Sequence, residues 1–208
     1  MAEGAACATI EGFAAALASD SPTPGGGSAA AAALALGAAL VGMSAQLTLV
    51  RKRFKPVHAE MERIVARTDE IRGEALTLIE ADADAYTGLL AAYRLPRASK
   101  AARADAVAAA ALAASRVPEA VGDLALEVID LASIAVGKAN PHVRSDAAAG
   151  AALARGAGRI CEMNIAANIG SVADKSARDE LERSCERFRS GLARADAAAD
   201  QVLSVLHA

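Results

Sequence analysis

Residues 29–50 form a run without a single charged side chain, and this run limits the folds open to the chain. It is long enough to cross a bilayer, for which about 20 apolar residues suffice. However, it consists mainly of Ala and Gly and contains Ser44, Gln46 and Thr48, so it is only weakly hydrophobic. We therefore expect a helix buried inside a protein core, and a membrane span at residues 29–50 is the alternative.

Composition favours an all-α protein, a multi-helix bundle with long amphipathic helices in a single domain over residues 1–208. Ala, Leu, Arg and Glu are frequent and form helices well, whereas β-branched and aromatic residues are too sparse for a sheet. Hydrophobic residues make up 54% of the chain, but most of them are Ala, which buries little area. We therefore expect helix packing between subunits. Separately, the uncharged run has small residues that would let other helices approach closely: Ala31, Ala35, Ala38, Gly42 and Ala45.

Turn residues divide the rest of the chain. Pro96 and Gly170 end helices, Asn140 begins a turn, and Pro118 suits a first helical turn. The expected helices span residues 9–18, 29–50, 57–92, 99–116, 119–138, 145–169 and 175–206.

Charge and cysteine usage exclude several functional classes. The net charge of −3 gives no general argument for nucleic acid as a partner. The cysteines are odd in number and widely spaced, which is typical of reduced thiols in a cytoplasmic protein. No Lys or Arg precedes residue 51, unlike a secretory signal peptide. No cluster has the spacing of metal ligands.

The segment before the uncharged run, residues 19–28, reads Ser-Asp-Ser-Pro-Thr-Pro-Gly-Gly-Gly-Ser. The glycines, Gly25, Gly26 and Gly27, permit positive φ and the close approach of a ligand. Ser28 is expected to be the N-cap of the next helix, where free N–H groups and the helix dipole suit a carboxylate, a phosphate or an electron-rich heterocycle. A plain connector between two helices is the alternative. The motif fits neither a P-loop nor a dinucleotide fingerprint.

A basic cluster follows the uncharged run, because four of residues 51–55 are cationic. Cations at a helix C-terminus complement the helix dipole. This number exceeds that need, so we consider a role for Arg51, Lys52 and Lys55 in holding an anionic ligand.

Asp82 lies on the apolar seam of the helix predicted over residues 57–92. The seam has alternating spacings of three and four and comprises Val57, Met61, Ile64, Thr68, Ile71, Ala75, Ile79, Asp82, Tyr86, Leu89 and Tyr93. A carboxylate on such a stripe is costly unless it is paired, and functional sites tolerate this cost. A structural, salt-bridged Asp is the alternative.

A second stripe, on the helix predicted over residues 145–169, places Asp146 and Asn164 on an inward face. Five helical turns, about 27 Å, separate them. They therefore serve different places, or one site only across subunits. Asp146 is also explained as a first-turn carboxylate facing the helix dipole.

Together these segments resemble the cyclodeaminase family of folate enzymes, which includes the C-terminal half of formiminotransferase-cyclodeaminase and stand-alone methenyltetrahydrofolate cyclohydrolases. The motifs that carry the resemblance occur in order at residues 19–28, 47–49, 78–86, 94–96, 140–147 and 164–169. The basic cluster departs from the family's lysine run, which affects the expected substrate preference more than the fold.

The resemblance implies an all-helical fold, a homo-oligomer with a dimer expected, and a site for a tetrahydrofolate derivative as substrate, with no cofactor, metal, nucleic acid or membrane. It implies Asp82 as the principal acid/base and Asp146 as a second carboxylate. The substrate-binding residues that it implies are Asp20, Pro24, Gly25, Gly26, Gly27, Ser28, Arg51, Lys52, Lys55, Tyr86, Asn140, Ser145 and Asn164.

The sequence favours hydrolysis of 5,10-methenyltetrahydrofolate to 10-formyltetrahydrofolate as the function, because no formiminotransferase half accompanies the chain. The first alternative is cyclodeamination of 5-formiminotetrahydrofolate to the methenyl compound and ammonia. A catalytically silent helical scaffold of the same fold is the second alternative, which the polar residues on the two stripes disfavour.

Overall fold

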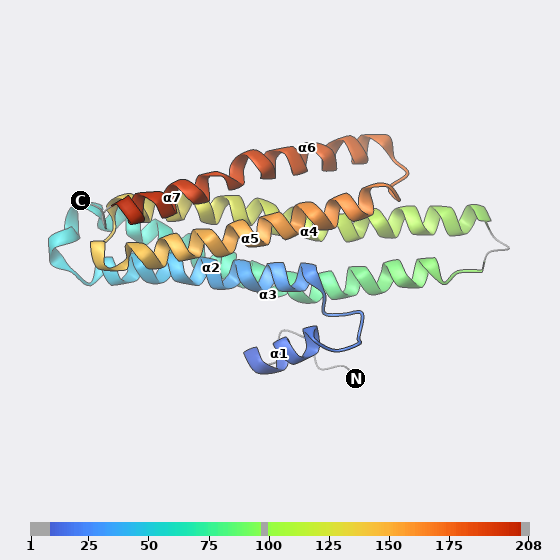
Figure 1. The fold of residues 1–208 in the computed structure, drawn as a ribbon, viewed down its shortest axis with the longest axis horizontal. Coiled ribbons are helices and arrows are strands. Elements are labelled where there is room, and N and C mark those ends of the chain that lie inside the picture. Colours follow the sequence, from blue (N-terminus) through green and yellow to red (C-terminus); the bar gives the residue numbers. More distant parts are fainter. Residues whose placement is uncertain (1–8, 97–99, 205–208) are drawn as a thin grey trace.

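A computed structural model describes residues 9–96 and 100–204, and this part of the chain contains helices and no strand (Figure 1). The all-α prediction is thus confirmed. The helices are α1 (Ile10–Leu17), α2 (Gly26–Leu49), α3 (His58–Tyr93), α4 (Lys100–Lys138), α5 (Arg144–Ile169), α6 (Lys175–Leu192) and α7 (Arg194–Leu203), with short 3₁₀ turns at Lys52–Val57 and Pro141–Val143.

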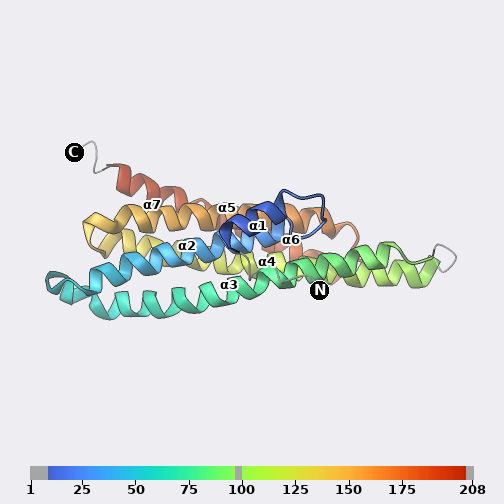
Figure 2. The same cartoon turned by 90° about the horizontal axis from the view of Figure 1, so that it is seen from below.

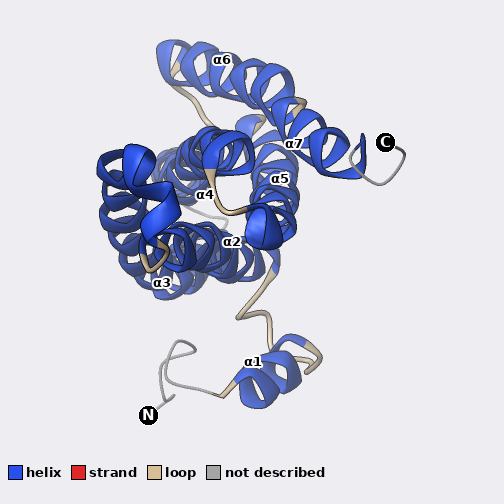
Figure 3. Cartoon of the chain, turned by 90° about the vertical axis from the view of Figure 1, so that its left-hand side faces the viewer, coloured by secondary structure: helices blue, strands red, loops and turns tan. Residues whose placement is uncertain are grey.

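Helix α2 packs against α3, α4 and α5, and the four form an elongated bundle (Figures 1 and 2). Helices α6 and α7 cover the outside of α4 and α5. Seen from its end, the bundle leaves α1 standing apart below α2 (Figure 3). Helix α1 has no buried residue, and Ile10 is 82% exposed.

Small residues form the contact between α2 and α5, as the small residues of the uncharged run predict for an approaching helix. All five small residues singled out above are buried on α2. At the crossing, a Cβ on Gly37 would lie 2.8 Å from the carbonyl oxygen of Gly150, and a Cβ on Gly150 would lie 2.7 Å from that of Gly37. The two backbones therefore approach more closely than any larger residue would allow.

In the described part of the chain, α2 alone has the length and hydropathy of a membrane span. In the structure, 56% of its most apolar 18-residue window is buried within the bundle. This burial supports the core-helix interpretation of residues 29–50.

Two expectations about the start of α2 are wrong. The helix begins at Gly26, and its N-cap is Gly25 rather than Ser28. No described glycine has a positive φ. The glycines instead allow close approach, and the Ser28 hydroxyl is free for bonds to another helix.

Two other helix boundaries differ from expectation. The predicted helices over residues 99–116 and 119–138 are one helix, α4, with Pro118 buried in its interior. Pro118 can be accommodated because packing along α3 and α5 stabilises a long helix. The predicted helix over 175–206, whose last two residues lie outside the described residues, is broken after Leu192. The break follows Gly191, where a Cβ would lie 2.5 Å from Leu126.

The α3 seam is buried from Met61 to Ile79, and Asp82 is half-buried where it reaches the pocket described below. On α5 the buried stripe is centred on Ala147, Ala151, Ala154, Cys161 and Ile165. Asp146 and Asn164 therefore flank the core and are only half-buried. Small residues occur on all sides of α5, so periodicity alone could not locate the centre of its buried face.

We expect Gly150→Ala to destabilise the protein by about 1–3 kcal/mol, because the added methyl group overpacks the crossing of α2 and α5. Thermal unfolding followed by circular dichroism measures this. Gly73→Ala is the matched control, because no atom lies within 4 Å of its new Cβ. The free energy of unfolding of the control should rise by about 0.5–1 kcal/mol, because alanine lowers the conformational entropy of the unfolded chain. Equal melting temperatures for the two variants would contradict the close crossing.

Candidate active site

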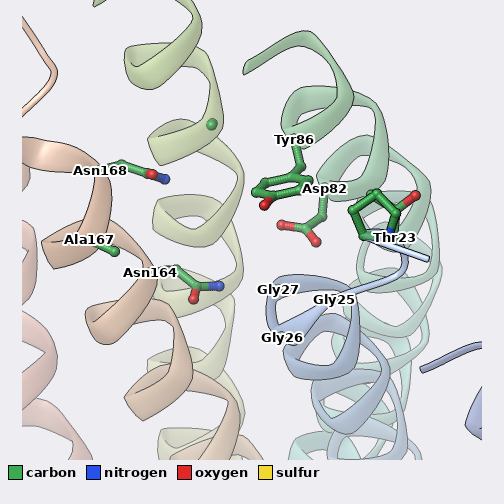
Figure 4. A pocket seen from close by; sticks show the side chains of 11 residues that line it. Thr23, Gly25, Gly26, Gly27, Asp82, Tyr86, Asn164, Ala167 and Asn168 are labelled. Atoms are coloured by element: carbon green, nitrogen blue, oxygen red, sulfur yellow. The ribbon is translucent and has the colours of Figure 1, made fainter. Parts of the chain in front are cut away.

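A pocket of about 300 Å³ lies at the start of α2 (Figure 4). It lies beyond the N-terminus of α2, where α3, α4 and α5 continue along the bundle. We call it the Asp82 pocket. Its lining residues come from the loop and first turn of α2 and from the other three helices: Pro22, Thr23, Gly25, Gly26, Gly27, Asp82, Tyr86, Ala114, Asn164, Ala167 and Asn168.

Asp82 is held by the first turn of α2. Its Oδ2 accepts a hydrogen bond from the backbone N–H of Ser28 at 2.7 Å. The Ser28 hydroxyl lies 2.9 Å from the same Oδ2 and 3.2 Å from the carbonyl oxygen of Ile79, so its single proton serves one of these two acceptors. Ser28 is fully buried. Oδ1 accepts no hydrogen bond from the described residues, so it is available to a ligand.

Gly27 makes this arrangement possible. A Cβ at this position would lie 2.0 Å from Oδ1 and 2.5 Å from the carboxyl carbon of Asp82. Any side chain would therefore push the carboxylate out of place. Glycine is therefore required at position 27 because a side chain of α3 occupies the space of its Cβ, and not because a turn needs it.

Three further polar side chains in the lining are Tyr86, Asn164 and Asn168. Figure 4 shows Tyr86 beside Asp82, and Asn164 and Asn168 extending from α5 toward the same space. Neither asparagine amide has a hydrogen-bond partner within residues 9–96 and 100–204, so both can bind a ligand. Asn168 is not among the predicted site residues. It lies one helical turn after Asn164 on the same face of α5, and this spacing is the signal that could have found it.

On the α4 side of the pocket, Pro118 removes one backbone hydrogen bond of the helix. Proline has no N–H, so Pro118 cannot donate the usual helical hydrogen bond to the carbonyl of Ala114. Ala114 lines the pocket.

The basic residues lie at the other end of α2. Arg51, Lys52, Arg53, Asn140 and His142 surround a second cleft of about 490 Å³, which we call the basic cleft. The side-chain oxygen of Asn140 accepts a hydrogen bond from Arg53 at 3.3 Å. The 24 residues of α2 separate this cleft from the Asp82 pocket by about 35 Å, at a rise of ~1.5 Å per residue.

The predicted site residues therefore fall into separate groups within one chain. Pro24 is in the loop beside the Asp82 pocket, and Asp20 is exposed in the same loop but does not line the pocket. Asp146 and Ser145 are in the first turn of α5, at the end of the bundle that holds the basic cleft. Lys55 is exposed in the 3₁₀ turn and does not line that cleft. The structure brings together Asp82, Tyr86, Asn164 and the loop, and does not bring Asp146 to them.

The described residues contain no group of three His, Cys, Asp or Glu side chains that could hold a metal ion. The polar side chains that line the Asp82 pocket are one carboxylate with a free oxygen, two amides, a phenol and the hydroxyl of Thr23.

Both the sequence and the fold of this chain match known proteins. The family model described as formiminotransferase-cyclodeaminase matches residues 9–187. A methenyltetrahydrofolate cyclohydrolase of Methylorubrum extorquens is 36% identical over 175 residues, which cover 83% of this chain and 84% of that protein. The formimidoyltransferase-cyclodeaminase of Mus musculus is 29% identical over 89 residues, 43% of this chain but 16% of its own length.

A crystal structure of formiminotetrahydrofolate cyclodeaminase from Thermotoga maritima shares the fold. The TM-score is 0.88 over 96% of this chain and 98% of the other, at 22% sequence identity.

We expect Cys161 and Cys185 to resist thiol reagents in the folded chain. Burial, with a smaller contribution from the charge of Asp82, raises the pKa of the Cys161 thiol far above its usual range. Burial, with the nearby charge of Glu162, also raises the pKa of Cys185. A raised pKa lowers the thiolate fraction at any given pH, so labelling at pH 8 should be more than about tenfold slower than for a free thiol.

The measurement is labelling of a Cys7→Ser chain with a chromogenic disulfide, before and after adding denaturant. Denaturant should expose both thiols and restore ordinary rates. Fast labelling of the folded chain would show that at least one of these two thiols is accessible to solvent.

Proposed function

The chain belongs to the formiminotransferase-cyclodeaminase family, and from this premise we propose that it is a methenyltetrahydrofolate cyclohydrolase. The proposed enzyme adds water to 5,10-methenyltetrahydrofolate and releases 10-formyltetrahydrofolate. Support comes from the Methylorubrum relative of that name, which matches most of both chains.

The observation that carries the proposal is the charge of the Asp82 pocket. Asp82 is the one charged side chain among the residues that line it. The methenyl carbon lies in a cationic amidinium between N5 and N10 of the folate. A fixed carboxylate in a partly buried site stabilises such a cation more strongly than water does. The free Oδ1 is the atom that faces the substrate.

In the proposed mechanism, water attacks the methenyl carbon while Asp82 Oδ1 takes one of its protons. The product of this step is a neutral tetrahedral carbon bonded to N5, N10 and a hydroxyl group. Asp82 then returns the proton to N5 as the bond between carbon and N5 breaks. The hydroxyl group loses its proton to solvent and becomes the formyl oxygen on N10. One proton is released in total, and no electrons are transferred.

Cyclodeamination is the alternative within the same family. It passes through the same kind of tetrahedral carbon, but N10 is the nucleophile, and the amino group on that carbon, once protonated, leaves as ammonia. The proteins of mouse and Thermotoga maritima carry that name. In this reaction Asp82 would transfer a proton to the departing nitrogen, and the enzyme would be an ammonia lyase.

We also propose that two copies of the chain form a homodimer that completes the site. A folate with its carbon at Asp82 cannot reach the basic cleft of the same chain about 35 Å away. An antiparallel pairing of α2 with α2 of a second copy would bring that copy's residues 51–55 to the Asp82 pocket. The glutamate carboxylates of the substrate would then meet Arg and Lys.

The exposed face of α2 supports such a pairing. It carries Leu36, Met43, Leu47 and Val50, which are 39–70% exposed, and residues 29–50 contain no charge. An uncharged apolar face with small residues suits close packing of identical helices.

The proposed reaction requires no cofactor, because water is the nucleophile and no electrons move. We place it in the cytoplasm, where unpaired cysteines stay reduced, and propose neither a nucleic acid nor a membrane as partner.

The proposal predicts enzyme-dependent loss of the methenyl absorbance band when purified protein meets 5,10-methenyltetrahydrofolate. Asp82→Asn should lower kcat by about 10²–10⁴-fold, because the proton acceptor is lost. Gly27→Ala should lower kcat by about 10²-fold, because its methyl group displaces the Asp82 carboxylate.

Gly88→Ala is the matched control on α3, since no atom lies within 4 Å of its new Cβ, and it should keep full activity. Appearance of the band from 5-formiminotetrahydrofolate, without hydrolysis of the methenyl compound, would replace the hydrolase with the cyclodeaminase. Inactivity in both assays would favour the scaffold. Full activity of Asp82→Asn would remove Asp82 from the mechanism.

The dimer proposal predicts complementation between two inactive variants. Asp82→Asn and an Arg51→Ala/Lys52→Ala double variant should each be impaired alone. Refolding an equal mixture should restore about a quarter of the wild-type sites, because half of the dimers are mixed and each has one intact site.

The same mixture combined without unfolding serves as the control for subunit exchange. No recovery in the refolded mixture, with dimers present by light scattering, would mean that each site belongs to one chain.

A further inference from the structure

We propose that Asn164 and Asn168 bind the 2-amino-4-oxopyrimidine ring of the folate, and thereby fix which end of the substrate enters the bundle. This inference rests on the substrate class proposed above. It assigns a role to Asn168, which sequence reasoning had left out of the site.

The two side chains form a pair on one face of α5. Residues four apart lie about 6 Å apart along a helix and point the same way. Figure 4 shows both amides extending from α5 toward the space in front of Asp82 and Tyr86. Both residues are half-buried, and neither amide is bonded to any group in the described part of the chain. Half-buried amides without partners lose hydrogen bonds unless water or a ligand binds them.

The chemistry of the pocket selects the ring end of the substrate. The lining of the Asp82 pocket contains no Lys or Arg, so it offers no partner to the glutamate carboxylates of the tail. An uncharged ring edge that carries both N–H donors and a carbonyl acceptor needs groups that accept and donate. An asparagine amide offers one carbonyl oxygen and two N–H donors, and two amides can serve such an edge at both of its ends.

This assignment sets the orientation of the substrate. The ring lies between α5 and Tyr86, and the carbon between N5 and N10 lies over Asp82 Oδ1. The benzoylglutamate tail then leaves the bundle past the loop of residues 22–25.

The test uses two fragments of the substrate and measures binding by calorimetry. The ring probe is 6-methyltetrahydropterin, which lacks the tail, and the tail probe is p-aminobenzoylglutamate, which lacks the ring. The variants are Asn164→Leu and Asn168→Leu, with Asn168→Asp as a variant of unchanged size. Gln201→Leu removes an exposed amide on α7 and is the matched control.

We expect each asparagine variant to weaken binding of the ring probe roughly tenfold or more, because an amide that binds the ring is lost. Binding of the tail probe, and binding of both probes to Gln201→Leu, should be unchanged. If the wild-type chain does not bind the ring probe, the inference is overturned. It is equally overturned if the asparagine variants bind that probe normally, or lose the tail probe instead.

Turnover of the methenyl substrate is measured separately on the wild-type chain, so the two proposals can fail independently. Active protein whose asparagine variants bind the ring normally would sink only the ring assignment. Inactive protein that loses ring binding in the variants would sink only the proposed reaction.

Discussion

The bonds from Ser28 to Asp82 join the first turn of α2 to the middle of α3, and the site depends on them. They fix Oδ2 and leave Oδ1 free, so one carboxylate presents one reactive oxygen in a known direction. The contact requires Gly27, because a Cβ would occupy the place of the carboxylate. The start of α2 is therefore determined by α3 as much as by its own loop.

The sequence predicts much of this fold and part of the site. Asp82 interrupts an otherwise apolar seam, and a carboxylate there needs a special partner, which Ser28 supplies. The residue that provides the bonds could not be foreseen, because Ser28 suited an N-cap equally well and the helix begins two residues earlier. The helix start predicted at Pro118 is wrong for a similar reason. The local preference of proline favours a helix start, but packing against α3 and α5 extends α4 through it.

The site residues predicted from the sequence motifs lie at two opposite ends of the bundle. Asp146 and Asn164 share a helix, yet one is near the basic cleft and the other lines the Asp82 pocket. Periodicity shows which face of a helix a residue lies on and how far along the helix it is. It does not show which residues of a second chain lie next to it. This is why the position of Asp146 relative to Asp82 could not be settled from the sequence.

The Asp82 pocket occupies the place that one more turn of α2 would fill. Pro24 disfavours the helical conformation at Thr23, so the helix cannot extend backward into that space. A bundle of this kind can acquire or lose a binding chamber through the position of a single proline, with its core unchanged.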